Sequence, residues 1–243
     1  MKSRVYALIL AAVMIVASVG SVSGQDFQRS MNTTISKIRH MLVKQSMSAR
    51  VIMTMSGARL GSVGPMEFLI TMSKGNVRTE MDYAKLMASV GAGKGKAPMG
   101  IDKMVTIYRP DKKVMYQVVP SLNACLEMAI QDPASGKADE IEIDRTSEGF
   151  ETIGKYVCEK VRNKSTTSAN VTTEVVMWEA KELGGMPIRM ETTTPEGVVT
   201  MNFEDINTAT PPASMFEPPV GATKYNTTQE MMMGAMMKMM QGK

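Results

Sequence analysis

The side chains that most often carry out chemistry are scarce in this chain of 243 residues. It has one histidine, His40, and two cysteines, Cys125 and Cys158. A Ser-His or Cys-His catalytic pair would depend on His40, which precedes the part of the sequence that is patterned as a folded domain. Histidine-rich zinc or iron sites are poorly supported for the same reason. We therefore expect a protein that is not an enzyme, with no resident cofactor and no metal site.

Two further features could suggest chemistry but have simpler interpretations. The acidic run at 139–144 is typical of a solvated loop or strand, and a hydrolase that works through carboxylates alone stays open as an alternative. The segment Gly91–Lys96 combines glycines with lysines but lacks the G-x-x-x-x-G-K-[ST] order of a phosphate loop. No helix pattern follows it to present an N-terminus to an anion. We predict a mobile flap at 84–100.

Methionine is unusually abundant in the chain, at 27 of 243 residues. It occurs as Met53-x-Met55 and in a cluster within the C-terminal tail at 226–243. Thioethers are soft ligands that prefer Cu(I), so a copper-handling function is one alternative. Methionine is also unbranched and adaptable, which suits surfaces that accommodate flexible apolar ligands. It can equally be an ordinary core filler, and the sequence leaves these interpretations open.

The first 24 residues are typical of a secretory signal peptide. Lys2 and Arg4 precede an apolar run at Val5–Val19 and the small residues Ser21–Gly24. The apolar run is short for a membrane span of about 20 residues. We expect cleavage near residue 24 and a location in the periplasm or outside the cell. No cysteine lies near this position, so we expect no N-terminal lipid anchor.

In an exported protein an even number of cysteines favours a disulfide over a metal pair or a catalytic thiol. A bond between Cys125 and Cys158 would close a loop of about 33 residues and contribute about 3 kcal/mol in the chain-entropy model. We therefore predict a Cys125–Cys158 disulfide.

The charge of the chain gives little reason to expect nucleic acid or an anionic membrane surface as a partner. The formal net charge is +4 at pH 7, and two of the positive residues lie in the predicted signal peptide. The rest of the chain is long enough for one domain with a substantial core. Peripheral contact with a membrane and the oligomeric state stay open.

Between residues 46 and 225 apolar residues recur mostly at every second position, the pattern of antiparallel strands with one buried and one wetted face. Strands are expected at 46–56, 66–72, 77–83, 105–109, 113–119, 141–150, 154–161, 171–181, 187–193 and 198–206. The first three form a meander, with a glycine-rich turn at 57–65 and a tight turn at Lys74–Asn76. Pro110-Asp111 suits a type I turn between the next two.

Two segments favour helix. The segment 120–130, which carries Cys125, is expected to be a short helix. Residues 25–45 place apolar side chains three or four positions apart, as in an amphipathic helix. The predicted organisation is a signal peptide at 1–24, an N-terminal amphipathic helix at 25–45, a β domain at 46–225 and a methionine-rich tail at 226–243, which can form a frayed helix.

Several short motifs within the predicted β domain resemble a known family. They are Tyr116-x-x-x-Pro120, the run Gly154–Val161 (GKYVCEKV), Trp178–Glu182 (WEAKE), Pro187–Met190 (PIRM) and Met215–Gly221 (MFEPPVG). Together with a signal peptide followed by antiparallel strands, they resemble exported proteins of unassigned function related to the lipoprotein carrier LolA and the receptor LolB. The resemblance covers about residues 46 to 225.

This resemblance implies a mainly β (α+β) fold, a curved antiparallel half-barrel with short helices as a lid over an apolar concave face. LolA and LolB hold the acyl chains of lipoproteins on that face. The sequence departs from the family in lacking the N-terminal lipid anchor of LolB. The arginine that latches the lid of LolA has no motif match in this sequence, and Arg50 and Arg78 are candidates for it by location alone.

Alternation and resemblance together predict an exported binding protein for a hydrophobic ligand, such as a lipid, an acyl chain or a lipoprotein. The apolar faces carry Met47, Met53, Met55, Met66, Met72, Met115, Met177, Met190 and Met201. The predicted ligand-binding residues of the concave face are Val51, Met53, Met55, Phe68, Ile70, Met72, Met115 and Met190. The alternatives are a methionine-rich copper-handling protein and a structural protein of the cell envelope.

Overall fold

The structure of the protein, a computed structural model, describes residues 46–57, 61–85, 101–130, 142–166, 172–194 and 197–241. The strands are β1 (Met47–Gly57), β2 (Gly61–Ser73), β3 (Asn76–Asp82), β4 (Lys103–Arg109), β5 (Val114–Val119), β6 (Ala124–Ala129), β7 (Glu142–Ile153), β8 (Tyr156–Thr166), β9 (Thr172–Ala180), β10 (Met186–Thr194), β11 (Gly197–Asn207) and β12 (Thr223–Tyr225). The helices are the 3-10 turns η2 (Pro120–Leu122), η3 (Lys181–Leu183) and η4 (Ala213–Phe216), and the α-helix α4 (Thr228–Gln241). The predicted signal peptide, the helix at 25–45 and most of the flap at 84–100 lie outside the described residues.

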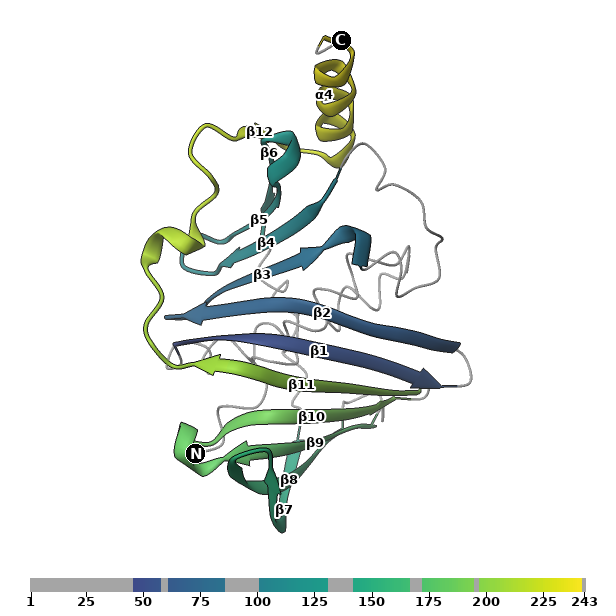
Figure 1. Cartoon of the computed structure of the whole chain (residues 1–243), viewed down its shortest axis with the longest axis vertical. Helices are drawn as coiled ribbons and strands as arrows, with labels where there is room; N and C mark the ends of the chain where they lie inside the picture. The colour runs from purple at the N-terminus through teal and green to yellow at the C-terminus, as the bar shows by residue number, and fades with distance from the viewer. Residues whose placement is uncertain are drawn as a thin grey trace.

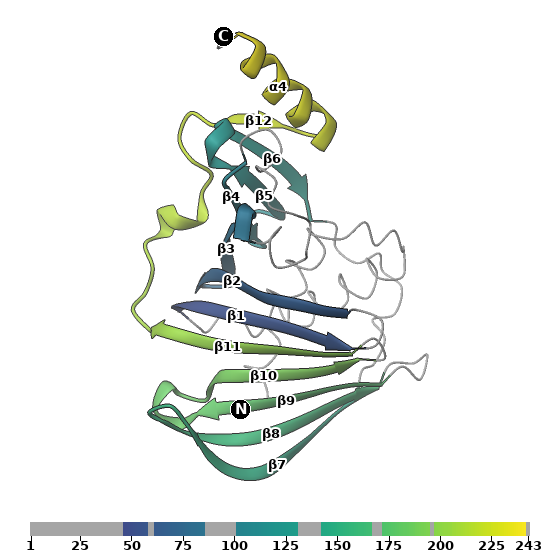
Figure 2. The same ribbon diagram turned by 45° about the vertical axis from the view of Figure 1, so that its right-hand side comes forward.

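All twelve strands belong to one open sheet with the order β12-β6-β5-β4-β3-β2-β1-β11-β10-β9-β8-β7 (Figure 1). Strand β1 lies near the middle, between β2 and β11. The meander β2–β6 extends to one side of it and β11–β7 to the other. Neighbouring strands are antiparallel except β12, which pairs parallel with β6. The sheet curves strongly (Figure 2), which confirms the predicted mainly β, curved antiparallel architecture.

The tight turns form where the sequence predicted them. Lys74 and Gly75 both have positive φ, 50° and 84°, as a type I′ turn between β2 and β3 requires. The Pro110-Asp111 turn joins β4 to β5, with the amide of Lys112 donating to the carbonyl oxygen of Arg109 at 3.2 Å. Local turn chemistry therefore sets the register of these two hairpins.

The predicted turn at 57–65 is too long, because β2 already begins at Gly61 and extends the β1–β2 hairpin. Met53 pairs with Met66 but Met55 pairs with Val63, so β2 carries an extra residue at this point. Pro65 lies in that irregularity, where its missing N–H costs no regular ladder hydrogen bond. A proline at a bulge was therefore misread as the end of a turn.

The predicted helix at 120–130 is also wrong. Only Pro120–Leu122 form a helical turn, η2, and Ala124–Ala129 form the strand β6. Asn123, at φ 47°, reverses the chain in the left-handed conformation so that β6 pairs antiparallel with β5. Tertiary pairing thus overrides the local apolar pattern in this segment.

The sheet has an inner and an outer face. The inner face carries the main hydrophobic cluster, 17 buried residues drawn mostly from β1–β3 and β9–β11, with Tyr108 of β4. Side chains from strands this far apart join one cluster because the curved sheet turns them toward each other. On the outer face, where side chains diverge, there are two separate smaller clusters, one on β4–β6 and one on β8–β10.

The chain crosses the outer face between β11 and β12, and we call residues 213–217 of this crossing the strap. Phe216 of the strap is 1% exposed and fills the cluster on β4–β6. Arg109 donates from Nη1 to the carbonyl oxygen of Phe216 at 3.0 Å and forms an ion pair with Glu217. Arg78 donates to the carbonyl oxygen of Met215 at 3.1 Å. The strap thereby holds the last part of the chain to the sheet.

The predicted frayed helix in the tail is the helix α4, which packs at the β6–β12 edge (Figure 1). Thr227 and Glu230 cap its first turn reciprocally. Thr227 Oγ1 accepts from the Glu230 amide at 3.1 Å, and Glu230 Oε2 accepts from the Asn226 amide at 3.0 Å. Met231 is buried against Leu126 and its neighbours. Within the described part of the chain, no helix has the length and apolarity to span a bilayer.

The predicted disulfide is wrong, because both cysteines are free and buried in different clusters. Cys125 lies on β6 and Cys158 on β8, and eight strands of the sheet separate β6 from β8. A disulfide requires Cα atoms within about 7 Å, whereas adjacent strands alone are about 4.8 Å apart. Burial also raises the pKa of both thiols, which makes them inert packing groups.

Candidate ligand-binding face

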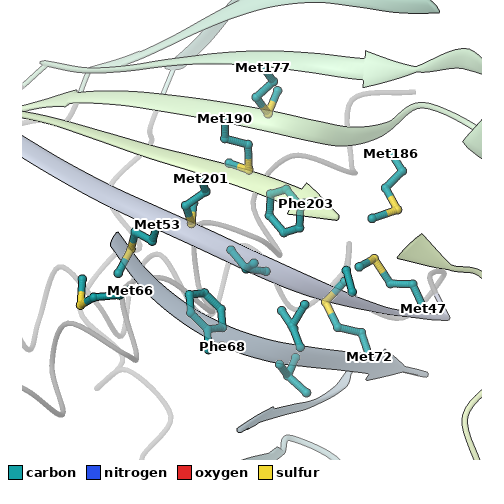
Figure 3. Close-up of a cluster of buried hydrophobic side chains, with 14 of the residues drawn as sticks. Met47, Met53, Met66, Phe68, Met72, Met177, Met186, Met190, Met201 and Phe203 are labelled. Atoms are coloured by element: carbon teal, nitrogen blue, oxygen red, sulfur yellow. The ribbon is translucent and has the colours of Figure 1, made fainter. Parts of the chain in front are cut away.

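The inner face is apolar and unusually rich in methionine. Of the 17 buried residues in its main cluster, nine are methionines and none is leucine. The nine are Met47, Met53, Met66, Met72, Met81, Met177, Met186, Met190 and Met201. Figure 3 shows most of them projecting from the same side of the strands, together with Phe68 and Phe203.

Five of these methionines form a transverse row across five neighbouring strands (Figure 3). In strand order from β9 to β2 the row is Met177, Met190, Met201, Met53 and Met66, each directly opposite the next. At about 4.8 Å per strand the row spans about 19 Å. Every member is at most 2% exposed. We call this row the methionine ladder.

Most of the predicted ligand-binding residues lie together on this face. Val51, Met53, Phe68, Ile70, Met72 and Met190 belong to the main cluster and are at most 2% exposed. Met115 is partly buried against the cluster, and the side chain of Met55 lies outside the described residues. Period-two alternation was enough to assign these residues to a face. Their contact with a ligand stays a prediction.

Among the buried clusters on the two faces of the sheet, methionine is concentrated in the main cluster of the inner face. The buried residues of the outer-face cluster on β4–β6 are valine, isoleucine, tyrosine, cysteine and phenylalanine. Those of the cluster on β8–β10 are cysteine, valine, tryptophan, alanine and isoleucine. Neither set contains a buried methionine. The outer clusters are therefore built from β-branched, aromatic and small side chains, whereas about half of the main inner cluster is flexible methionine.

A polar group that the sequence did not identify lies beside the β9 end of the ladder. Arg145 of β7 and Asn163 of β8 are opposite each other, and Asn163 is opposite Val175 of the main cluster, so both are on the inner face. The guanidinium of Arg145 reaches across β8 to Glu179, with both nitrogen–oxygen distances at 2.9 Å. Glu179 and Asn163 are 9% and 5% exposed. These side chains lie far apart in the sequence, so only the strand pairing brings them together.

The two arginines assigned by location to a lid latch are on the opposite face, which corrects that assignment. Arg50 is opposite Leu69 and pairs with Glu204 and Asp205 at 2.6 and 2.9 Å on the outer surface. Arg78 pairs with Glu80 at 2.8 Å and binds the strap. Both occupy positions that alternate with the buried residues of their strands, so neither guanidinium can act on the inner face.

The other candidate chemical groups are dispersed. Within the described ranges, no three His, Cys, Asp or Glu side chains lie close enough to hold a metal ion. From the acidic run at 139–144, Asp144 is exposed on β7, and 139–141 lie outside the described residues. On α4, Met233, Met236 and Met237 are 55–62% exposed, in contrast to the methionines of the inner face.

No family model matches the chain, and no curated protein matches it. Solved structures with a similar fold include lipoprotein LppX of Mycobacterium tuberculosis, at 9% identity and TM-score 0.39, over 75% of this chain and 98% of that one. A LolA superfamily protein of Nitrosomonas europaea has 12% identity and TM-score 0.34 over 72% and 90% of the two chains. LprF of Mycobacterium bovis has 12% identity and TM-score 0.37 over 80% and 98%. A LolA superfamily member is thus among them, as the sequence resemblance predicted. At these TM-scores the likeness carries no argument about function.

Proposed function

We propose that this protein is an exported, non-enzymatic binding protein that holds the hydrocarbon chain of a lipid or of an acylated protein on the inner face of its sheet. The methionine ladder is the track for that chain. The observation that supports the proposal is the distribution of methionine between the two faces. A function of this kind requires one surface whose side chains can adapt to a flexible apolar ligand. The opposite face of the sheet does not need such side chains.

The competing interpretation is that methionine is a general core filler in this chain. That interpretation predicts buried methionine wherever there is a core, including the outer-face clusters. Their buried residues contain none, whereas the inner cluster has nine among 17. Face-specific use of a flexible side chain favours a face-specific function.

The dimensions of the ladder suit an acyl chain. Burying a methylene group is worth about 0.8 kcal/mol, so a chain along a track of about 19 Å binds without a strong polar contact. The ladder side chains are at most 2% exposed, so a ligand must displace the groups that cover them. That displacement lowers the apparent affinity in proportion to the population of the open state, and it slows binding. Affinity measurements therefore require equilibration before they are read.

A fluorescent fatty-acid probe tests this function on residues 25–243 purified after export from a bacterial host. We expect saturable binding that Met190→Trp weakens at least tenfold, because the indole at the second position of the ladder fills the space that the chain would take. The matched control is Leu69→Trp, which adds the same ring at a 47% exposed position on the outer face of β2. Thermal unfolding of both variants shows whether they are folded. Equal probe binding by the wild type and folded Met190→Trp would refute the proposal.

A second function is favoured by one observation, the exposed methionines of α4. Met233, Met236 and Met237 have the i, i+3, i+4 spacing that brings side chains together on a helix surface. Three thioethers so placed are a soft ligand set for Cu(I). Competition with a colorimetric Cu(I) chelator tests it. The expected result is one Cu(I) bound by wild type and none by a variant with leucine at these positions, and equal retention by both would exclude the site.

A further inference from the structure

Asn163 lies on the inner face next to the end of the methionine ladder. Val161, two residues away on β8, is opposite Met177, the β9 member of the ladder. Two residues along a strand span about 7 Å, so Asn163 is within reach of the head of a chain that lies on the ladder. Val161 and Met177 are fully buried, so the path between the ladder and Asn163 is apolar.

The Nδ2 donor of Asn163 is buried, and no hydrogen-bond acceptor for it is found among the described residues. The residue as a whole is 5% exposed. Buried donors are almost always paired, because an unpaired one loses its bonds to water and gains nothing in return. A donor kept in this state beside an apolar track is suited to an acceptor supplied by a ligand.

The charges around Asn163 restrict the kind of acceptor. The guanidinium of Arg145 is bound by both carboxylate oxygens of Glu179 at 2.9 Å. The Arg145–Glu179 pair is therefore neutral as a unit. A ligand carboxylate would be desolvated beside a guanidinium whose charge is already compensated by Glu179, which disfavours it. A neutral carbonyl oxygen accepts from the amide without that cost.

The strand pairing also indicates how a ligand would be oriented. Ser147 of β7 is opposite Val161 and is exposed, whereas Val161 itself is fully buried. The inner face thus changes from buried to solvated between β8 and β7. An amphiphile on this face would place its tail over the ladder and its head toward β7.

We infer that Asn163, beside the Arg145–Glu179 pair, forms a subsite for the ester carbonyl of an acylated ligand whose chain lies along the methionine ladder. The inference rests on the proposed function, because the chain on the ladder brings the carbonyl to the amide. It adds a chemical selection: acyl esters bind more tightly than ethers or free fatty acids of the same length.

A matched pair of ligands tests this selection. 1-Monopalmitoylglycerol and 1-O-hexadecylglycerol differ only in the carbonyl group, and both can be titrated by displacement of the fluorescent probe. We expect wild type to prefer the ester about tenfold, which is the scale of one additional hydrogen bond. Asn163→Leu, of similar branched shape but without the donor, should bind the two ligands within twofold of each other. Palmitate should bind wild type more weakly than the ester.

The control variant is Asn76→Leu, which removes another side-chain amide, one whose buried Oδ1 is unpaired within the described residues, on the outer face at the start of β3. It should keep the ester preference of wild type. A readout that needs no variant is the side-chain amide resonance of Asn163, which should shift with the ester and not with the ether. Equal binding of the two ligands by wild type, or a preference that survives Asn163→Leu, would overturn the subsite while leaving the proposed function intact. If neither ligand binds, the proposed function fails and the subsite fails with it.

Discussion

Replacing Arg109 should destabilise the protein, because its guanidinium is the main polar link between the strap and the sheet. The side chain is 10% exposed, donates to the carbonyl oxygen of Phe216 at 3.0 Å and pairs with Glu217. It also binds both carboxylate oxygens of Asp111, at 2.8 and 2.7 Å. These hydrogen bonds raise the pKa of the guanidinium, so it is charged at every accessible pH. Arg109→Met keeps the apolar stem and removes the donors.

The size of the stability loss expected in Arg109→Met depends on how exposed the groups that Arg109 binds are. The bond to the strap carbonyl is buried, and hydrogen bonds to a charged group are worth about 1.5–3 kcal/mol. The Asp111 and Glu217 side chains are 51% and 41% exposed, so their ion pairs add little beyond this. We expect a loss of about 2–4 kcal/mol in the free energy of unfolding, or about 4–16 °C in Tm for a domain of this size.

Chemical denaturation with urea, followed by circular dichroism, measures this loss. The matched control is Arg50→Met, whose arginine also binds two carboxylates but on the exposed surface, and which should cost at most about 1 kcal/mol. Equal losses in the two variants, or a loss under about 1 kcal/mol in Arg109→Met, would refute the argument that burial of the strap contact determines its contribution.

Three further predictions concern pH and chemical reactivity. The pKa of Asp111 is lowered by the hydrogen bond from Arg109, and that of Glu217 by those from Lys112 and Arg109. Their contribution to stability is therefore present above about pH 4–5 and lost as the pH falls below about 4, and urea titrations across this range should show less acid destabilisation in Arg109→Met. The two buried cysteines should resist alkylation at pH 8 in the folded protein and both react in urea without reductant, whereas a disulfide would leave no reactive thiol. Under mild peroxide, Met233, Met236 and Met237 of α4 should be oxidised well before the ladder methionines, which peptide mass spectrometry measures, and equal rates would show that the ladder is open to solvent.

Local signals in the sequence were sufficient for much of the fold. Alternation placed Val51, Phe68 and Met190 on a buried face, because the period of a strand is two whatever its partners are. The turn residues Lys74-Gly75 and Pro110-Asp111 gave two hairpins, because their backbone preferences act within a few residues. Both kinds of inference depend only on near neighbours in the chain.

What the sequence could not provide depends on long-range pairing. The ladder exists because β1 pairs with β11, about 150 residues later in the chain, in a register that sets Met53 opposite Met201. The same order of strands places Cys125 and Cys158 far apart, so counting cysteines predicted a bond that the topology forbids. The polar group around Asn163 was missed for the same reason, since no local pattern links three strands.

Two other predictions failed because a local sequence pattern was overridden by strand pairing in the folded sheet. The segment 120–130 has a helical distribution of apolar residues, but pairing of β6 with β5 satisfies its backbone and buries Leu126. Pro65 suggested a turn, whereas a β-bulge accommodates it within β2. In both cases the hydrogen bonds of the completed sheet determined the outcome.

Native mass spectrometry of residues 25–243, exported from a bacterial host, can show directly whether the inner face binds a hydrocarbon chain. We expect an added mass that dissociates as a lipid, and that is lost in folded Met190→Trp and retained in Leu69→Trp. A bare mass for wild type, with no uptake of an added acyl ligand after equilibration, would contradict this expectation and reduce the methionine ladder to ordinary core.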